Sequence, residues 1–349
     1  MSIKKGRILT GHRPTGPRHI GHLVGTLENW RRLQDDYECF FLVADLHVLT
    51  TDYANPGRIR QNTIEIVTDW LAAGIDPDRS TLVLQSAIPA HSQFSALLSM
   101  LVTVSRLERV PTYKEQIQNL GVQPSLGLLT YPVLQTADIL LYKADTVPVG
   151  EDQLPHLELA RELTRRFDQL YAPLFPEPQA LLSANPRLPG TDNRTMHTSY
   201  GNVIYLKDSP AETTRKVMSM FTDPTRIHAT DPGHVEGNPV FTYLDVFHPD
   251  AAEVGDMKER YRAGKVGDIQ VKQRCAEVLN EYLAPLRARR AEIAARPRQV
   301  LEILQHGTDR ARPVAAETVE EVMRLMGLSA GLDLNAETAA VPEVKGAFC

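Results

Sequence analysis

The sequence is poor in cysteine and in long apolar runs, and both absences narrow its class. Its 349 residues include three cysteines, Cys39, Cys275 and Cys349, and no Cys-x-x-Cys pair. Neither a disulfide framework nor a structural zinc site is therefore indicated. No run approaches the ~20 apolar residues of a membrane-spanning helix, and residues 1–6 lack the apolar core of a signal peptide. We expect a cytoplasmic protein that makes no membrane contact.

A strong excess of basic charge is also missing. The formal net charge of −5 at pH 7 argues against indiscriminate nucleic-acid binding, but it permits a local basic patch. Residues 284–313 are such a patch, and they predict either contact with an RNA backbone or a solvated helix face. The basic side chains of this segment are Arg287, Arg289, Arg290, Arg296, Arg298, Arg310 and Arg312.

The length is sufficient for about two domains, and the character of the chain changes near residue 212. The first half alternates expected strands with expected helices, whereas amphipathic helices predominate afterwards. The strands are expected at 39–46 and 81–86, and the helices at 58–74, 271–283 and 314–326. We predict an α/β fold, with a Rossmann-like parallel-sheet domain at 1–211 and an all-helical domain at 212–330. A loosely held tail is expected at 331–349.

The first motif with chemical content is His19-Ile20-Gly21-His22. A strand pattern at 7–10 and a turn-rich loop at 11–16 precede it, and helically spaced apolar residues follow it. The two histidines would share one face of a helix start, whose free N–H groups suit phosphate. Gly21 would let a purine ring approach the backbone. The alternative is a turn with a core histidine.

A second motif covers residues 129–142 and predicts a helix entered through Pro132. Gln135 and Asp138 would project from one side, with Tyr131 just ahead of them. An aspartate in so apolar a segment is costly to bury unless it accepts hydrogen bonds. It indicates either a binding residue or a structurally paired carboxylate.

A third motif follows at residues 147–153. Val147 and Val149 could form an apolar wall, and Gly150 permits close approach of a ligand to the backbone. Asp152 and Gln153 then open a helix, where an acidic residue can also serve as a simple cap.

These three motifs together resemble those of bacterial tryptophanyl-tRNA synthetases, which are class I aminoacyl-tRNA synthetases. The segments 44–47 and 107–115 resemble the same family in the same order. The resemblance is clear over residues 8–202 and loose over the helical remainder. Tyrosyl-tRNA synthetases share the fold and the first motif, but the Gly-Glu-Asp-Gln segment is more typical of the tryptophan enzymes.

The resemblance implies a pocket for L-tryptophan, whose indole presents an apolar face and one N–H donor. Asp138 would accept that N–H, and an analogue without the donor would leave a buried carboxylate unpaired. The walls would be Leu9, Val147 and Val149, and the residues that hold the amino group or orient the pocket would be His47, Tyr131 and Gln153. Gln135 stands where the family often has methionine or glutamine.

The implied reaction is attack of the tryptophan carboxylate on the α-phosphate of ATP, assisted by Mg²⁺, followed by transfer of tryptophan to tRNA(Trp). Positioning and charge stabilisation would carry it, without a general base. His19 and His22 would contact phosphate, and Gly21 would lie under adenine. The remaining ATP contacts would come from Arg13 and Lys114 for phosphates and from Gly150 and Asp152 for the ribose.

The chain departs from the family in the loop that normally reads Lys-Met-Ser-Lys-Ser. Met196 and Ser199 match that loop, but Thr195 and Thr198 stand where the two lysines belong. Arg194 could replace part of the lost charge. We therefore expect weakened use of ATP, and an auxiliary copy with an additional protein partner is one interpretation.

The resemblance also implies an assembly and leaves two rival functions. Residues 107–174 would form the interface of a homodimer, and the helical domain would bind the anticodon. The first rival is an adenylate-forming enzyme for another amino acid. The second is a non-catalytic protein that binds tryptophan, ATP or a protein partner.

Overall fold

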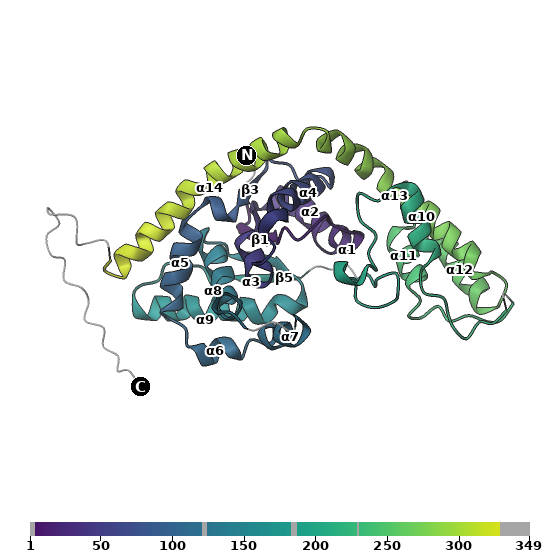
Figure 1. Cartoon of the computed structure of the whole chain (residues 1–349), viewed down its shortest axis with the longest axis horizontal. Helices are drawn as coiled ribbons and strands as arrows, with labels where there is room; N and C mark the ends of the chain where they lie inside the picture. The colour runs from purple at the N-terminus through teal and green to yellow at the C-terminus, as the bar shows by residue number, and fades with distance from the viewer. Residues whose placement is uncertain (1–3, 121–123, 183–186, 229, 329–349) are drawn as a thin grey trace.

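A five-stranded parallel sheet forms the centre of the described part of the molecule (Figure 1). The computed structural model describes residues 4–120, 124–182, 187–228 and 230–328. The strand order is β3-β2-β1-β4-β5. The strands are β1 (Arg7–His12), β2 (Glu38–Val43), β3 (Ser80–Leu84), β4 (Thr146–Val149) and β5 (Gln179–Leu182). The predicted Rossmann-like fold class is confirmed.

The strands are central because their side chains are apolar on both faces. Every residue of β2 after Glu38 is buried, as expected for a parallel strand covered by helices on both sides. Ile8 of β1 is in register with Cys39 of β2 on one side and with Thr146 of β4 on the other. The strand expected at 39–46 ends earlier, at Val43, because residues 46–48 form a 3₁₀ turn.

The direction of strand addition reverses between β1 and β4, and this reversal determines where a ligand can bind. From β1 the chain adds β2 and β3 on one side, whereas β4 and β5 lie on the other side. Ligands of open parallel sheets bind in the crevice at the carboxyl ends of the strands at such a point. The segment His19–His22, called the histidine motif below, follows β1, and the segment Gly150–Gln153 follows β4. Both segments therefore lie at this crevice.

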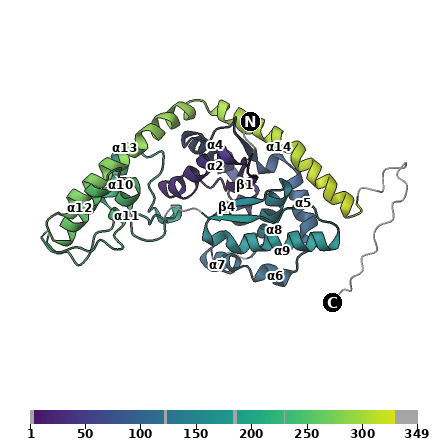
Figure 2. The same cartoon turned by 180° about the vertical axis from the view of Figure 1, so that it is seen from behind.

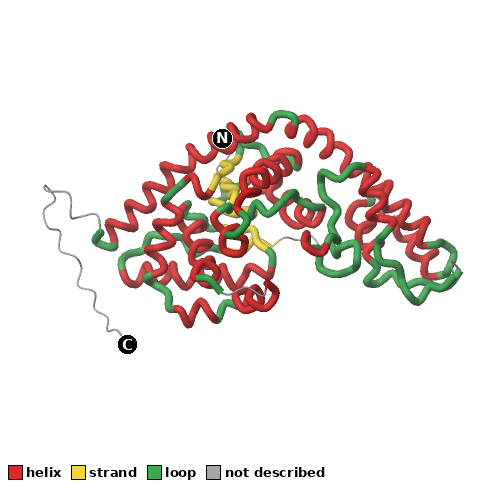
Figure 3. The backbone as a smooth tube through the Cα atoms, in the orientation of Figure 1, coloured by secondary structure: helices red, strands yellow, loops and turns green. Residues whose placement is uncertain are grey.

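Helices cover both faces of the sheet, as Figure 3 shows in red around the yellow strands. A π-helical turn, Leu23–Leu27, joins α1 (Ile20–His22) to α2 (Glu28–Asp36). The other helices of the first half are α3 (Leu49–Asp52), α4 (Ile59–Ala72), α5 (Ala90–Ser99), α6 (Val104–Glu108), α7 (Pro111–Leu120), α8 (Leu126–Leu141) and α9 (Leu154–Leu170). Helix α4 matches the expected helix at 58–74.

The start of α8 differs from the prediction. The helix begins at Leu126, and Pro132 lies inside it. The Ser125 side chain accepts a hydrogen bond from the backbone N–H of Leu128 at 3.1 Å. This N-cap supplies a start signal upstream of the proline, so the motif lies in the middle of a buried helix.

The second half is helical, as expected, but its last helix returns to the sheet. Helices α13 (Asp268–Ala294) and α14 (Pro297–Leu325) form an arch over the molecule in both views (Figures 1 and 2). The shorter helices beneath α13 are α10 (Pro210–Met218), α11 (Pro239–Phe247) and α12 (Ala251–Arg262). The backbone N–H of Leu84, on the edge strand β3, donates to Thr308 of α14 at 3.0 Å. The proposed domain at 212–330 therefore includes a helix that covers the edge of the first domain's sheet.

Five arginines of the basic segment, Arg287, Arg289, Arg290, Arg310 and Arg312, donate hydrogen bonds to other elements of the chain, and Arg289, Arg310 and Arg312 among them are also exposed to solvent. Arg290 donates to Asp69 and Glu65 of α4, and its side chain is 12% exposed. Arg289 donates to the carbonyl of Ala72, and Arg310 and Arg287 also have protein acceptors. Their acceptors are carboxylates, backbone carbonyls and, for Arg287, the hydroxyl of Thr213. Arg298 fits the solvated alternative, since its side chain is 92% exposed.

Two further expectations concern the C-terminal tail and membrane-spanning helices. The predicted tail at 331–349 lies outside the described residues. Among the described helices, none is long and apolar enough to cross a membrane.

Candidate active site

The histidine motif begins where β1 ends, and backbone pairing holds it in place. His19 is the extended N-cap of α1, with φ −116°. The N–H of Ile20 donates to the carbonyl of Ile204 at 3.0 Å, and the N–H of Leu206 donates to the carbonyl of Arg18 at 2.9 Å. The motif is thus paired with the segment that directly follows the variant loop at 194–199.

The predicted residues His19 and His22 lie together, and His12 joins them. The ring centroids of His19 and His22 are 3.8 Å apart, and those of His12 and His22 are 5.3 Å apart. Burial and the neighbouring Arg18 charge lower the pKa of His19 to about 3 and lower the pKa of the other two rings. All three imidazoles are therefore neutral at pH 7. The Nδ1 atom of His19 is buried and has no hydrogen-bond partner among the described residues.

Gly21 is adjacent to the variant loop through Met196. A Cβ atom at Gly21 would lie 2.9 Å from the sulfur of Met196 and 3.0 Å from Nδ1 of His19. A side chain at position 21 would therefore displace both neighbours. In this structure Met196 covers the surface where an adenine ring is predicted to lie, so nucleotide entry would require Met196 to move.

In the loop at 190–202, the single arginine, Arg194, makes its contacts with other residues of the loop itself. Arg194 donates to Asp192 at 2.7 Å and lies over the Tyr200 ring at 5.2 Å. Asn202 fixes the backbone around it, because it donates to the carbonyl of Thr195 and accepts from the N–H of His197. The side chain of Ser199 lies outside the described part of the structure.

Asp138 is buried in a polar cluster with His47, Gln85 and His91. Oδ1 contacts His91 Nδ1 at 2.7 Å and accepts from Gln85 Nε2 at 2.8 Å, and Oδ2 lies 2.9 Å from His47 Nε2. Burial opposes ionisation, but the hydrogen bonds from His47 and His91 outweigh it and lower the pKa of Asp138. The second ring nitrogen of His91 contacts the hydroxyl of Tyr142 at 2.9 Å.

The sequence reasoning predicted two members of this cluster and missed the others. Asp138 and His47 were placed in the tryptophan pocket, and the structure brings them into contact. Gln85 and His91 follow β3 and open α5, so no local motif connects them with Asp138. A usable signal was that Gln85 directly follows the apolar run of β3, at the sheet edge where ligands of parallel sheets bind.

Tyr131 and Gln153 also come close to other polar groups. The Tyr131 hydroxyl contacts His156 Nε2 at 2.8 Å and Thr112 Oγ1 at 2.6 Å. Burial lowers the pKa of His156 to about 4 and raises the pKa of Tyr131. Gln135 Nε2 lies 3.5 Å from Gln153 Oε1. Helices α7, α8 and α9 therefore jointly fix this side of the predicted pocket.

The three residues predicted as apolar walls share one cluster, whereas the residues predicted to contact ATP outside the histidine motif are more scattered. Leu9 and Val147 are buried on neighbouring strands in one apolar cluster, and Val149 packs against it. Gly150 caps the turn after β4, and a Cβ there would lie 2.7 Å from Asp152. Arg13 donates to Thr51 at 2.5 Å. Lys114 lies on α7 and is not joined to the histidine motif by any contact of the described residues.

A comparison of the sequence with protein families finds a match over most of the chain. Residues 2–284 fit the family described as tRNA synthetases class I (W and Y). The chain belongs to this family. The match covers the five-stranded sheet, the histidine motif, the polar cluster around Asp138 and the variant loop.

Relatives of this synthetase family align along almost the whole chain. It is 48% identical over 333 residues to a tryptophan–tRNA ligase of Treponema pallidum, covering 93% of this chain and 97% of the relative. It is 47% identical over 325 residues to the Thermotoga maritima ligase, with 92% and 99% covered. The solved tryptophanyl-tRNA synthetase of Campylobacter jejuni, complexed with ADP and tryptophan, superimposes with a TM-score of 0.83 at 31% identity. That alignment covers 92% of this chain and all of the other.

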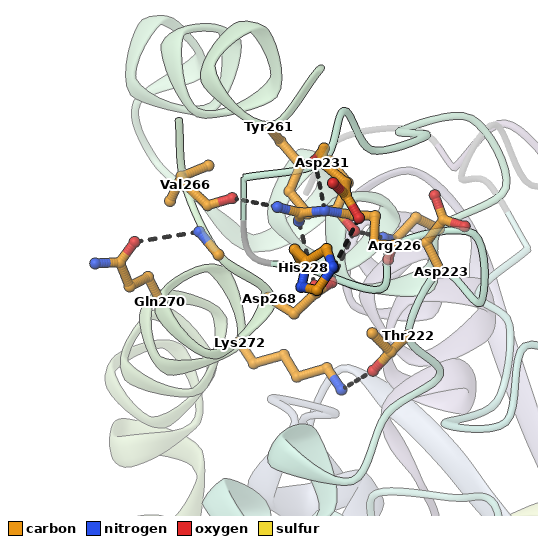
Figure 4. Close-up of polar contacts among 12 residues, drawn as sticks. Thr222, Asp223, Arg226, His228, Asp231, Tyr261, Val266, Asp268, Gln270 and Lys272 are labelled. Carbon is orange, nitrogen blue, oxygen red and sulfur yellow. Dashed lines mark hydrogen bonds and ion pairs between the residues drawn. The ribbon is translucent and has the colours of Figure 1, made fainter. Parts of the chain in front are cut away.

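The helical part of this synthetase contains a separate polar cluster, shown in Figure 4. Arg226 lies 4.3 Å over the Tyr261 ring and donates to the carbonyl of Val266 at 3.0 Å and to Asp268 at 3.2 Å. Lys272 donates to Thr222 at 2.6 Å. These charges have protein partners, so the cluster fastens the segment before α11 onto α13.

Proposed function

We propose that this chain is a tryptophan–tRNA ligase that forms tryptophanyl-adenylate from ATP and then transfers tryptophan to tRNA(Trp). The observation that carries the proposal is the buried, ionised Asp138, whose chain neighbours Ala137 and Ile139 belong to the same apolar cluster as the predicted walls Leu9 and Val147. An apolar site with one buried acceptor suits an indole better than a phenyl or aliphatic side chain. The ligase relatives support the same assignment.

Binding of the indole N–H to Asp138 requires one present donor to give way. Asp138 already contacts Gln85, His91 and His47. Of these three, His47 is the most exposed, at 7%, whereas Gln85 and His91 are 0% exposed. We infer that His47 turns away and that Gln85 and His91 continue to hold the carboxylate ionised.

The adenylation step needs positioning and charge stabilisation. The tryptophan carboxylate is ionised and nucleophilic at pH 7, so the site has to hold it in line with the α-phosphate. Neutral His19 and His22 can each donate one N–H to a phosphate oxygen. Gly21, Gly150 and Asp152 are proposed to hold the adenosine, with Met196 moving off Gly21.

Mg²⁺ is proposed to accompany the nucleotide. No group of three or more His, Cys, Asp or Glu side chains in the described chain could hold a metal ion. Mg²⁺ prefers phosphate and carboxylate oxygens and retains water. It would therefore be held by the ATP phosphates, where it neutralises charge.

A homodimer through residues 107–174 is part of the proposal. Leu126, at the start of α8 within this segment, is 76% exposed, and Met100 and Val104, which precede the segment in the chain, are 77% and 60% exposed. Contact with a second copy would cover such apolar side chains. Light scattering of the wild type should give the dimer mass, and a monomer at working concentration would contradict this part.

The activity is tested by tryptophan-dependent exchange of pyrophosphate into ATP, with tyrosine in parallel. We expect exchange with tryptophan alone. The Asp138→Ala variant should lose it, whereas the matched change Asp78→Ala at an exposed turn should not. Exchange with tyrosine would favour another amino acid, and tryptophan binding without exchange would favour the non-catalytic rival.

A further inference from the structure

The variant loop offers little positive charge to the leaving pyrophosphate. Its one basic residue, Arg194, is paired with Asp192 at 2.6 Å, and its side chain is 68% exposed. Thr195 and Thr198 carry no charge. A departing pyrophosphate gains negative charge as the bond to the α-phosphorus breaks, so a cation elsewhere should compensate.

Arg18 is a buried cation directly before the histidine motif. The residue is 5% exposed, and its guanidinium donates to the carbonyl of Gly16 at 2.6 Å. No carboxylate pairs with this guanidinium in the described chain. Asp69 instead accepts a hydrogen bond from the backbone N–H of Arg18 at 2.6 Å. The Nε atom of Arg18 is buried without a partner among the described residues.

A buried charge without an ion pair is costly, and contact with an anionic ligand would offset that cost. Burial lowers the pKa of Arg18 only to about 10, so the group is charged at pH 7. Its charge is also one reason why the neighbouring histidines are neutral.

The guanidinium also faces the atom of His22 that a phosphate would use. The Nη1 atom of Arg18 lies 3.4 Å from Nε2 of His22. If His22 donates Nε2–H to a phosphate oxygen, Nε2 can no longer accept from Arg18. The Arg18 Nη1–H and the His22 Nε2–H would then point toward the same space and would both need an acceptor. One oxygen of the phosphate chain can accept from both.

We propose that Arg18 is a catalytic residue of the adenylation step, whose guanidinium binds the leaving pyrophosphate and compensates for the missing loop lysines. In that step a tryptophan carboxylate oxygen bonds to the α-phosphorus. The bond from the α-phosphorus to the bridging oxygen breaks, and the electron pair leaves with pyrophosphate. Arg18 gives up no proton. The inference rests on the proposed function above.

The first test compares Arg18→Met and Arg18→Lys with the surface control Arg298→Met. We expect Arg18→Met to lower kcat of tryptophan-dependent exchange by about 100- to 1000-fold, the size of loss seen when a transition-state donor is removed. Tryptophan affinity should stay within about threefold. Arg18→Lys should recover part of the rate, and Arg298→Met should match the wild type. A kcat for Arg18→Met within about threefold of the wild type would overturn the inference.

The second test restores a lysine in the loop. If Arg18 compensates for the loop, Thr198→Lys should rescue Arg18→Met by at least about tenfold and raise the wild-type rate much less. Equal effects in the two backgrounds would refute compensation. If Arg194→Met lowers the exchange rate more than Arg18→Met does, the positive charge that stabilises pyrophosphate comes from the loop instead.

The two proposals can fail separately. A wild type without tryptophan-dependent exchange refutes the proposed function. ATP binding by equilibrium dialysis then still tests Arg18: binding weakened about tenfold or more in Arg18→Met supports a phosphate contact. Unchanged ATP affinity, with a folded variant by circular dichroism, refutes it.

Discussion

Replacing Arg290 with methionine should destabilise the protein strongly, because the buried carboxylate of Asp69 would lose the cation that pairs with it. Arg290 Nε donates to Asp69 Oδ1 at 2.6 Å, and the Asp69 side chain is 0% exposed. Methionine keeps most of the aliphatic stem, so the change mainly removes charge and hydrogen bonds. Asp69 would retain only the backbone N–H of Arg18.

The magnitude follows from two limits. Removing one partner of a buried ion pair costs about 3–5 kcal/mol. Asp69 can instead take up a proton, and protonating an aspartate side chain, whose ordinary pKa is 3.8, costs about 4 kcal/mol at pH 7. The smaller of the two governs, so we expect the free energy of unfolding to fall by about 3–4 kcal/mol at pH 7.

The loss should shrink as the pH falls. Burial already raises the folded-state pKa of Asp69, against the Arg290 charge that lowers it, and removal of Arg290 raises that pKa further. A carboxyl group with a raised folded-state pKa destabilises above that pKa, and the destabilisation is relieved as the pH falls towards the unfolded value. At pH 5 the cost of protonation falls to about 2 kcal/mol.

Urea unfolding of Arg290→Met at pH 7 and pH 5, beside the wild type, measures both quantities. Arg298→Met on α14 is the matched control, because it breaks an exposed pair with Glu302. Such pairs contribute about 0.2–1 kcal/mol. A loss below about 1 kcal/mol for Arg290→Met at pH 7, or an equal loss at both pH values, would refute the reasoning.

Four further outcomes are expected. Gly307→Ala should lower the free energy of unfolding by more than about 2 kcal/mol, because the added Cβ would lie 2.2 Å from the Leu82 carbonyl. Gly255→Ala, with open space in α12, should raise that free energy by about 0.5–1 kcal/mol, and urea unfolding compares the two. Burial raises the pKa of the Cys39 and Cys275 thiols to about 12, so in a Cys349→Ser background a disulfide reagent at pH 8 should label neither until the chain unfolds. Tyr131→Phe should raise KM for tryptophan roughly tenfold if the hydroxyl holds the ammonium group, whereas an unchanged KM would assign Tyr131 to the His156 network alone.

Local patterns predicted the parts of the structure that local forces determine. The apolar run after Glu38 formed a buried strand, and the two motifs after β1 and β4 lie at the same crevice, because strand ends and helix starts are encoded nearby. The start of α8 was missed because a serine cap outside the motif sets it. The residues placed in the tryptophan pocket remain predictions until ligand binding is measured.

The contacts that sequence reasoning missed join residues far apart in the chain. Gln85 and His91 reach Asp138 from 53 and 47 residues away, and Arg290 reaches Asp69 across 221 residues. Local periodicity and spacing contain no information on such pairs. The arginine segment shows the consequence, because its charge pattern resembled a free basic surface while five of its guanidinium groups donate to acceptors on other elements.

The carboxylate of Asp69 contacts both Arg290 and the backbone of Arg18, so it links the stability of the fold to the site at the histidine motif. One of its oxygens accepts from Arg290 on α13, and the other accepts from the backbone N–H of Arg18 at the histidine motif. Because the side chain is fully buried, neither bond can be replaced by water without cost. Displacement of α13, which leads into the helical part, therefore acts on the same group that orients Arg18. If Arg18 binds the leaving pyrophosphate, Asp69 makes the position of α13 a determinant of adenylation as well as of stability.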